Sequence, residues 1–348
     1  MAGISKPIYL LGLGSIGSFI AHSLRSIAHP PPVTLLIHRA DLYKQLSSRK
    51  LGLRIGEDGP LDEQSGFDAE LLSGTPSSCT DPIHHLIVTV KAPATVTALQ
   101  PYKHRIGRET TICFFQNGLG QLDELNERLF TDPSTRPRYM CGIARHGVYL
   151  RSATEAILSG PNGSAAVGFL ESRDSDSDTG TTPSQDRFLI DTLLRSPRLR
   201  CTELNSLDLL HVQLLKLASN CLINPLTALL DVRNGELLHN TQTWPTQRRL
   251  LSEISHVFGG IPAIQTLSRR GFDFSATSLE SVVRDTVGQT ALNSSSMRED
   301  VRKGRATEIE YLNGWIIKRG KELGIDCAFN QCLTQMILAK NNQGAGSS

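Results

Sequence analysis

A glycine-rich turn near the start of the chain joins an apolar run to a helical pattern. Pro7–Leu11 is apolar and of strand length, and the next six residues, Gly12–Gly17, read G-L-G-S-I-G. Apolar residues then recur at helical spacing as far as Ile27. A strand, a G-x-G-x-x-G turn and a helix in this order predict a parallel α/β sheet whose first turn binds a dinucleotide, in preference to a plain turn.

The three glycines have different functions in such a unit. Gly12 allows the tight turn, Gly14 lets the backbone approach a pyrophosphate, and Gly17 lets the helix pack closely on the strand. Amides at the helix N-terminus would bind the anion. The residues expected to form this part of the cofactor site are Gly12, Leu13, Gly14, Ser15, Ile16 and Gly17.

The end of the second expected strand, Val33–Ile37, indicates which cofactor binds. NAD-binding units usually have Asp or Glu here, bonded to the ribose 2′-hydroxyl, whereas this strand is followed by His38 and Arg39. A guanidinium suits a 2′-phosphate, so the sequence favours NADP (NADPH). The alternative is that Arg39 is an ordinary surface residue, and Asp41 nearby weakens the inference.

Two later apolar runs, Leu86–Val90 and Thr111–Phe115, are predicted to be buried strands of the same sheet. Lys91 and Asn117 follow them, at the strand ends where ligands bind in open α/β sheets. We expect cofactor and substrate to meet there, although polar residues at strand ends are also common in ordinary turns. Further short strands are predicted within 51–82, Gly142–Leu150, Ala165–Leu170 and Leu199–Thr202.

The character of the chain changes near residue 205. Glu171–Gln185 is dominated by Ser, Asp and Thr, which predicts a flexible loop, and from about Leu207 onward the pattern is helical. We therefore predict an α/β N-terminal Rossmann-type dinucleotide-binding domain over residues 1–205, with the loop at 171–185. An all-α C-terminal substrate and catalytic domain is predicted over residues 206–342.

The first helix of the second domain carries three polar residues on one face. Lys216, Asn220 and Asn224 recur every four residues within an apolar run, and Pro225 is expected to end the helix. Buried polar side chains are costly unless they are satisfied. They either bond to loop carbonyls and solvent or line a cleft that holds a polar small molecule, and their spacing leaves both open.

Two further polar residues of this domain have simple structural explanations. Ser296 fits the hydroxyl at the start of a helix. Thr307 and Glu310 form a T-x-x-E capping box, which would make Glu308 an acid in the first turn of a helix.

Composition argues against several classes of function. The formal net charge is +2 without a basic block, so neither nucleic acid nor an anionic membrane is expected as a partner. The seven cysteines form no C-x-x-C or His-Cys pattern, so neither a metal nor a structural disulfide is expected. No run is long enough to span a membrane and the first residues lack a signal sequence, which predicts a cytoplasmic protein.

Taken together, these motifs resemble those of the ketopantoate reductase (2-dehydropantoate 2-reductase) family over nearly the whole chain. In chain order they are GxGxxG at 12–17, Arg39, Lys91, QNGLG at 116–120, KxxxNxxxNPLTA at 216–228, NGEL at 234–237, SSMxxD at 295–300 and GRxTEI at 304–309. The later motifs are much more specific than the glycine motif. The resemblance implies a Rossmann domain followed by a helical domain, an active site in the cleft between them, NADPH as cofactor and no metal.

The resemblance also implies residue roles. Lys216 is the catalytic lysine, which would stabilise and protonate the carbonyl oxygen. Glu308, also a catalytic position near the cofactor, would accept a hydrogen bond from the substrate 4-hydroxyl and help to keep Lys216 charged. The remaining implied positions are Asn220, Asn224 and Ser296 for substrate (Ser296 at its carboxylate), Asn117 for substrate and cofactor, Lys91 near the ribose and nicotinamide, and Arg39 at the 2′-phosphate.

The implied reaction is reduction of ketopantoate to pantoate, a step toward pantothenate and coenzyme A. The partner is then a small 2-oxo acid, and a homodimer is compatible with this assignment. Two alternatives stay open: a reductase of another branched 2-oxo acid, and a non-catalytic nucleotide-binding regulatory protein. The second would be expected to have lost Lys216 or Glu308, and both are present.

Overall fold

The computed structural model describes residues 6–46, 48, 50–72, 79–170 and 184–345. By compactness the chain divides into two units. Residues 1–116 and 122–209 form the first, and residues 117–121 and 210–348 form the second. The domain limits derived from the sequence remain predictions.

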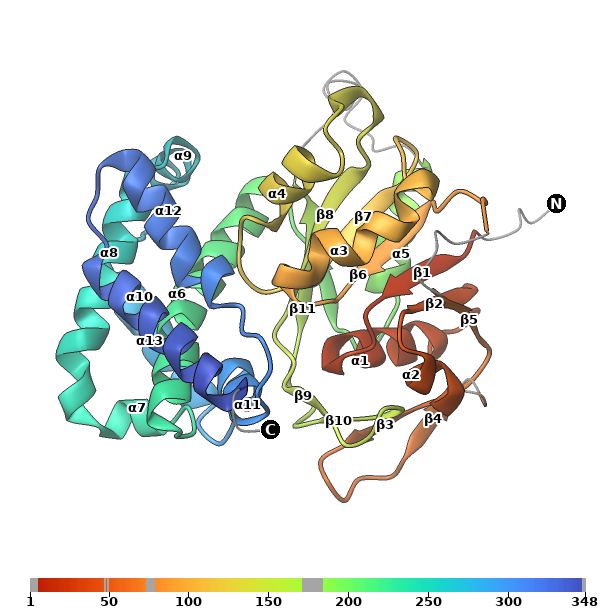
Figure 1. Ribbon diagram of the computed structural model, residues 1–348, viewed down its shortest axis with the longest axis horizontal. Coiled ribbons are helices and arrows are strands. Elements are labelled where there is room, and N and C mark those ends of the chain that lie inside the picture. The colour runs from red at the N-terminus through yellow and green to blue at the C-terminus, as the bar shows by residue number, and fades with distance from the viewer. Residues whose placement is uncertain (1–5, 47, 49, 73–78, 171–183, 346–348) are drawn as a thin grey trace. The chain divides into compact units, whose positions relative to one another are not determined.

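Within the described part of the first unit, eight strands form the main sheet, in the order β12-β11-β8-β7-β6-β1-β2-β5 (Figure 1). Neighbouring strands run parallel, except that β8 and β11 are antiparallel. Their bounds are β1 Ile8–Leu11, β2 Val33–Ile37, β5 Phe67–Leu71, β6 His85–Val88, β7 Thr111–Phe114, β8 Arg138–Ala144, β11 Ala165–Phe169 and β12 Cys201–Glu203. The predicted Rossmann-type α/β fold of this unit is confirmed.

Alternate residues of the central strands pack on opposite faces of this sheet. Ile8 and Leu10 of β1 join the apolar cluster that includes helices α1 (Ser15–Arg25) and α5 (Ser184–Leu194). Tyr9 and Leu11 join the cluster that includes α3 (Thr95–Leu99) and α4 (Gln121–Arg128). Because both faces are covered, these strands appear in the sequence as continuous apolar runs.

A smaller sheet, which the sequence did not predict as a separate layer, packs against α1. Its order is β4-β3-β10-β9, and its strands are β3 Leu51–Ile55, β4 Asp62–Gln64, β9 Val148–Leu150 and β10 Glu155–Leu158. The shorter helices of the unit are α2 Ala40–Gln45, η1 Ala92–Ala94, η2 Gln100–Arg105 and η3 Pro133–Thr135. Of the predicted loop at 171–185, residues 171–183 lie outside the described residues. The prediction is wrong for the last two residues of this loop, Ser184 and Gln185, because they begin α5.

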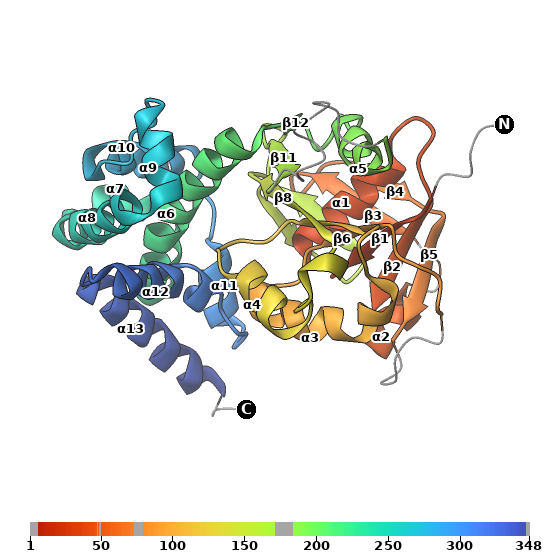
Figure 2. The same ribbon diagram turned by 90° about the horizontal axis from the view of Figure 1, so that it is seen from above.

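The second unit is helical, as predicted, and α12 packs with α8 and α13 (Figure 2). Its helices are α6 Ser206–Leu230, α7 Glu236–His239, η5 Thr241–Thr243, α8 Trp244–Gly260, α9 Pro262–Arg269, α10 Ala276–Gln289, α11 Ser296–Arg302, η6 Ile309–Tyr311, α12 Asn313–Leu323 and α13 Ala328–Ala345. The first residues of α6, up to Leu209, belong to the other unit.

The prediction that Pro225 ends its helix is wrong, because α6 continues through it to Leu230. Proline has no N–H, so the carbonyl of Cys221 loses its usual helical donor. The buried side-chain amide of Asn313 replaces that donor, with its Nδ2 at 2.9 Å from the Cys221 oxygen. A contact from another helix thus offsets the local preference of proline to end a helix.

The predicted capping box is also wrong, whereas Ser296 does lie at the start of a helix, as the first residue of α11. Glu308 precedes a single 3₁₀ turn, η6, without a side-chain cap, and the next α-helix begins only at Asn313. At the start of α11 the capping hydroxyl belongs to Ser295, whose Oγ accepts from the Arg298 amide at 3.1 Å. Ser296 is instead exposed. The simple structural explanation for Glu308 therefore does not hold, and Ser296 begins α11 without being its capping residue.

Candidate active site

The glycine turn between β1 and α1 has the shape that a dinucleotide pyrophosphate needs. Gly12 has φ +105°, and a Cβ there would lie 2.7 Å from the Val90 amide nitrogen. A Cβ at Gly17 would overlap the carbonyl oxygen of Gly12. At Gly14 no atom lies within 4 Å of an added Cβ, and the residue is exposed. Two glycines therefore close the turn on itself, while the third leaves its outer side open.

The helix that follows this turn presents its first amides without competition. Gly14 is the N-cap of α1 and makes no side-chain cap bond, and the first turn of the helix contains no acidic residue. Such an end attracts an anion through its N–H groups and its positive potential. The turn and the helix start together fit the pyrophosphate of a dinucleotide, whose phosphates they would hold.

The strand order of the sheet places the other predicted cofactor residues. The chain leaves β1 for β2 on one side, while β6 pairs with β1 on the other side, so the β1–β6 boundary is the switch point where such sheets bind ligands. Arg39 is exposed directly after β2, as the N-cap of α2. Lys91 is half-buried just past β6, as the N-cap of η1.

Gln116, which the sequence analysis did not single out, fixes the segment that carries Lys91. Its Nε2 donates to the Val90 carbonyl at 2.6 Å and to the Thr95 hydroxyl at 2.8 Å. The residue lies directly after the β7 end and reaches across to the β6 end. The only signal in the sequence was its place before Asn117 in the Q-N-G-L-G motif.

In the helical unit, α6 is continuous over Lys216, Asn220 and Asn224, which therefore lie along one face. Lys216 and Asn220 are half-buried, and Asn224 is only 7% exposed. Burial increases along the face toward Pro225. An ammonium group followed by two carboxamides is the arrangement that was expected if this face holds a polar small molecule.

Asn117 and Glu308, 191 residues apart, meet within this unit. The Asn117 Nδ2 donates to Glu308 Oε2 at 3.2 Å, and the carboxylate residue is only 8% exposed. The backbone fixes the pair, because the Leu119 amide donates to the Tyr311 carbonyl at 2.8 Å. Gly118, with φ +83°, permits this approach, since a Cβ there would lie 2.5 Å from the Tyr311 oxygen.

Ser296 is attached to α6 through residues that sequence reasoning missed. The Thr227 hydroxyl donates to Ser295 Oγ at 2.7 Å. Arg298 Nε donates to Asp231 Oδ1 at 2.9 Å, directly after the end of α6. The start of α11, where Ser296 lies, is thereby fixed relative to the helix that carries Asn224.

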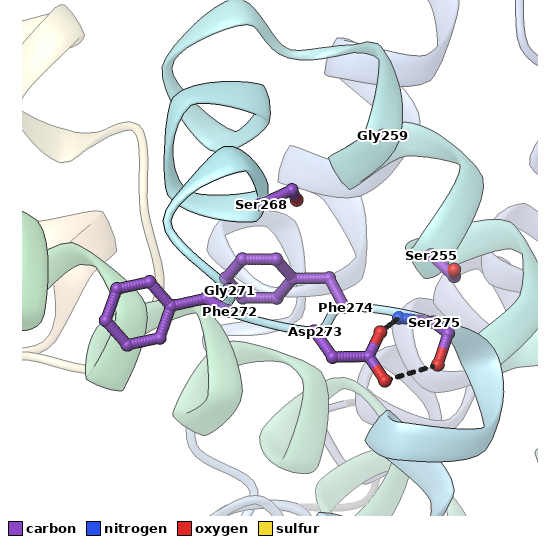
Figure 3. A pocket seen from close by; sticks show the side chains of 8 residues that line it. All are labelled: Ser255, Gly259, Ser268, Gly271, Phe272, Asp273, Phe274 and Ser275. Atoms are coloured by element: carbon purple, nitrogen blue, oxygen red, sulfur yellow. Dashed lines mark hydrogen bonds between the residues drawn. The ribbon is translucent and has the colours of Figure 1, made fainter.

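A separate hollow of about 430 Å³ occurs in the helical unit and contains none of the predicted site residues (Figure 3). It is lined by Ser255, Gly259, Ser268, Gly271, Phe272, Asp273, Phe274 and Ser275. Asp273 there accepts hydrogen bonds from the amide and hydroxyl of Ser275, so its carboxylate stabilises the start of α10.

In the part of the chain that is described, no group of three or more His, Cys, Asp or Glu residues could hold a metal ion. None of the described helices is both long and apolar enough to cross a membrane.

Comparison with known proteins shows which sequences and folds this chain is similar to. The chain is 28% identical to the 2-dehydropantoate 2-reductase of Archaeoglobus fulgidus, covering 95% of this chain and 97% of the relative. It is 26% identical to a ketoisovalerate reductase of Gibberella fujikuroi, covering 95% and 82%. In fold it is similar to a D-mandelate dehydrogenase solved with NADH and anilino(oxo)acetate. That similarity has a TM-score of 0.78 and 21% identity, and covers 97% of this chain and 99% of that one.

Two family models, matched in the same order as the two units, account for most of the chain. Residues 8–172 match the model described as ketopantoate reductase PanE/ApbA. Residues 208–341 match the model of the C-terminal part of the same family. The chain therefore belongs to the ketopantoate reductase family.

Proposed function

We propose that this protein reduces ketopantoate to pantoate with NADPH. The observation that carries the proposal is the Asn117–Glu308 pair, which gives the helical unit a buried carboxylate oriented by an amide. A buried hydrogen-bond acceptor of this kind suits a substrate that presents a hydroxyl group, as ketopantoate does at C4. Membership of the family and the retained Lys216 support the same reaction.

Each residue of the helical unit has a chemical task in this proposal. When bound, the nicotinamide supplies the hydride that the carbonyl carbon receives. Lys216 stabilises the negative charge that develops on the carbonyl oxygen and donates a proton to it. Asn220 and Asn224 add neutral hydrogen bonds that do not cancel the charge of the lysine, and exposed Ser296 binds the carboxylate end of the substrate.

The α/β unit supplies the cofactor site. The turn at residues 12–17 and the start of α1 hold the pyrophosphate, and Arg39 contacts the 2′-phosphate that distinguishes NADPH from NADH. Lys91 is assigned to the ribose and nicotinamide, and Asn117 and Glu308 of the helical unit are proposed as further cofactor contacts. A cytoplasmic location and a homodimer belong to the same proposal and can be tested by cell fractionation and light scattering.

A second candidate is the reduction of another branched 2-oxo acid. The similarity to a ketoisovalerate reductase favours it. This chain is 26% identical to that relative and 28% identical to the 2-dehydropantoate 2-reductase of Archaeoglobus fulgidus, so the two identities differ little. Glu308 separates the two candidates, since a 2-oxo acid without a hydroxyl offers this carboxylate nothing to bind.

NADPH oxidation by the purified protein, measured against a small panel of 2-oxo acids, tests the proposal. We expect ketopantoate to have the highest kcat/KM, followed at a distance by 2-oxoisovalerate and pyruvate. A higher kcat/KM for 2-oxoisovalerate would support the second candidate instead. NADPH binding without oxidation by any 2-oxo acid would support a regulatory nucleotide-binding protein.

A further inference from the structure

The hydroxyl of Thr89 lies at the place where the dinucleotide turn begins. β1 and β6 are parallel neighbours, and their last residues, Leu11 and Val88, are paired across the switch point of the sheet. Gly12 and Thr89 are the residues that follow. The Thr89 amide continues the ladder by donating to the Leu11 carbonyl at 2.9 Å. Its side chain is therefore held beside the first glycine of the turn.

The Thr89 hydroxyl donates to the carbonyl of Gly12, the first glycine of this turn. Its Oγ1 is 2.5 Å from the Gly12 carbonyl oxygen and 3.3 Å from that of Leu11. Gly17 of α1 approaches the same Gly12 oxygen so closely that a Cβ on it would overlap the oxygen. The Gly12 carbonyl is thus enclosed between the hydroxyl of one strand end and the backbone of the helix.

Fixing this carbonyl also fixes an amide on the other side of the peptide. In a trans peptide the C=O of one residue and the N–H of the next point in opposite directions. A Gly12 carbonyl directed at Thr89 therefore turns the Leu13 N–H away from Thr89 and from the backbone of α1 that encloses this carbonyl. The side away from Thr89 is the one on which a pyrophosphate would bind the turn.

We propose that Thr89 is a positioning residue for the cofactor, whose hydroxyl holds the Gly12–Leu13 peptide so that the Leu13 amide is directed at the dinucleotide pyrophosphate. The proposal rests on the proposed function only as far as the protein binds a nicotinamide dinucleotide. Thr89 does not itself touch the ligand. Its removal should weaken dinucleotide binding through the turn, without changing the groups that act on the 2-oxo acid.

The chain offers a matched control for this bond. Thr110, directly before β7, is buried whereas Thr89 is half-buried, and its Oγ1 donates to the Ile83 carbonyl at the same distance of 2.5 Å. It lies at the amino end of the strands, away from the glycine turn. Thr110→Val therefore removes a similar bond from the same unit and reports what a loss of stability alone does to cofactor binding.

The test compares Thr89→Val, Thr89→Ala, Thr89→Ser and Thr110→Val in the full chain, by calorimetric titration with NADPH and by steady-state kinetics. In Thr89→Val and Thr89→Ala the Leu13 amide should no longer be directed at the pyrophosphate. Because a hydrogen bond to a charged group is strong, its loss should raise the Kd for NADPH about tenfold. Thr89→Ser keeps the hydroxyl and should bind like the wild type, as should Thr110→Val. At saturating NADPH, kcat should change little in all four variants.

Three results would overturn the proposal: wild-type affinity in both Thr89→Val and Thr89→Ala, an equal loss in Thr110→Val, or no recovery in Thr89→Ser. If Thr89→Val does not fold, Thr89→Ala compared with Thr89→Ser decides the question. Failure of the proposed function looks different. The wild type would then bind NADPH and reduce no 2-oxo acid, while the order of affinities among the variants would still hold.

Discussion

The side-chain amide of Asn313 donates to the carbonyl oxygen of Cys221, at 2.9 Å and in a fully buried position. Cys221 lies four residues before Pro225, so its carbonyl is the one that the missing proline N–H would have bonded. The same Asn313 amide donates to Asn330 Oδ1 at 2.9 Å, and Asn330 donates in turn to Glu253 at 2.7 Å. The start of α12 thereby links α6, the helix that carries Lys216, to α13 and α8.

This arrangement predicts a coupling between Asn313 and Pro225 in the free energy of unfolding. Asn313→Ala leaves two buried acceptors without their donor, which should cost about 1–3 kcal/mol. In a Pro225→Ala background the backbone N–H that the substitution restores can serve the Cys221 carbonyl, so the loss of the Asn313 amide should cost less. Urea unfolding of the two single variants and the double variant measures the difference, and strictly additive values would contradict the relationship.

The sheet could be predicted because its signals are local. The predicted strand Val33–Ile37 coincides with β2, and the other central strands differ from prediction only at their ends. The small sheet could not be predicted in the same way, because β3 pairs with β10 about a hundred residues later in the chain. The continuation of α6 through Pro225 was missed for the same reason, since the compensating donor is 92 residues from Cys221.

The sequence predicts a set of candidate site residues, but it does not predict their contacts. Glu308 looked locally like an acid in the first turn of a helix, and only the fold brings Asn117 to it. Thr89 and Gln116 were missed because their side chains bond to backbone carbonyls of neighbouring segments, which leaves no pattern in the sequence. A lone hydroxyl in the apolar run before Lys91 was the only available signal for Thr89.

A buried histidine of α1 makes the α/β unit sensitive to acid. His22 is 1% exposed, its Nε2 lies 3.0 Å from the Asp62 carbonyl oxygen, and its Nδ1 is without a partner among the described residues. Burial lowers the pKa of His22 below its ordinary value of 6.5, partly opposed by the Asp62 carbonyl and carboxylate and reinforced by Arg198. Below pH 6.5 the unfolded chain therefore binds more protons at this position than the folded chain.

The free energy of unfolding should accordingly be unaffected by His22 above pH 6.5 and should fall as the pH decreases from there toward the folded pKa. His22→Gln should flatten this dependence, whatever its effect on stability at neutral pH. Identical slopes for the wild type and His22→Gln, measured by urea unfolding at several pH values, would show that His22 does not titrate in this way.

Arg39 should determine the preference between the two nicotinamide cofactors. It is exposed two residues after the last residue of β2, at the carboxyl end of that strand. A charge-assisted hydrogen bond contributes roughly 1.5–3 kcal/mol, so Arg39→Ala should weaken NADPH binding about tenfold or more. The affinity for NADH should hardly change. Titration with both cofactors checks this, and equal losses would mean that Arg39 does not contact the phosphate.

Lys216 should supply the proton for the reaction. General acid catalysis is typically worth about 10²–10⁴-fold, so Lys216→Ala should reduce kcat on that scale while the Kd for NADPH stays near that of the wild type. Exposed Lys321 on α12 offers a control, since Lys321→Ala should leave kcat unchanged. Near-normal turnover in Lys216→Ala would assign the proton donor to another group.

Glu308 should distinguish ketopantoate from simpler 2-oxo acids. A buried carboxylate facing an anionic 2-oxo acid is unfavourable unless the substrate offers a donor, and ketopantoate offers its C4 hydroxyl. Sites built to bind a hydroxyl can reject analogues without it by up to about 10⁴–10⁵-fold. 2-Oxoisovalerate keeps the branched carbon but lacks the hydroxymethyl group, so its kcat/KM should be far lower than that of ketopantoate.

Substitution of this pair should reduce the discrimination in a specific way. Glu308→Ala should reduce the difference in kcat/KM between ketopantoate and 2-oxoisovalerate, mainly by lowering kcat/KM for ketopantoate. Asn117→Ala should have part of this effect, because its Nδ2 donates to one Glu308 carboxylate oxygen at 3.2 Å. Glu310, exposed in the 3₁₀ turn that follows Glu308, is the matched control. Glu310→Ala should leave kcat/KM for both substrates unchanged. Equal kcat/KM for both substrates in the unmodified enzyme would show that Glu308 does not recognise the C4 hydroxyl of ketopantoate. The general 2-oxo acid reductase would then be the better assignment.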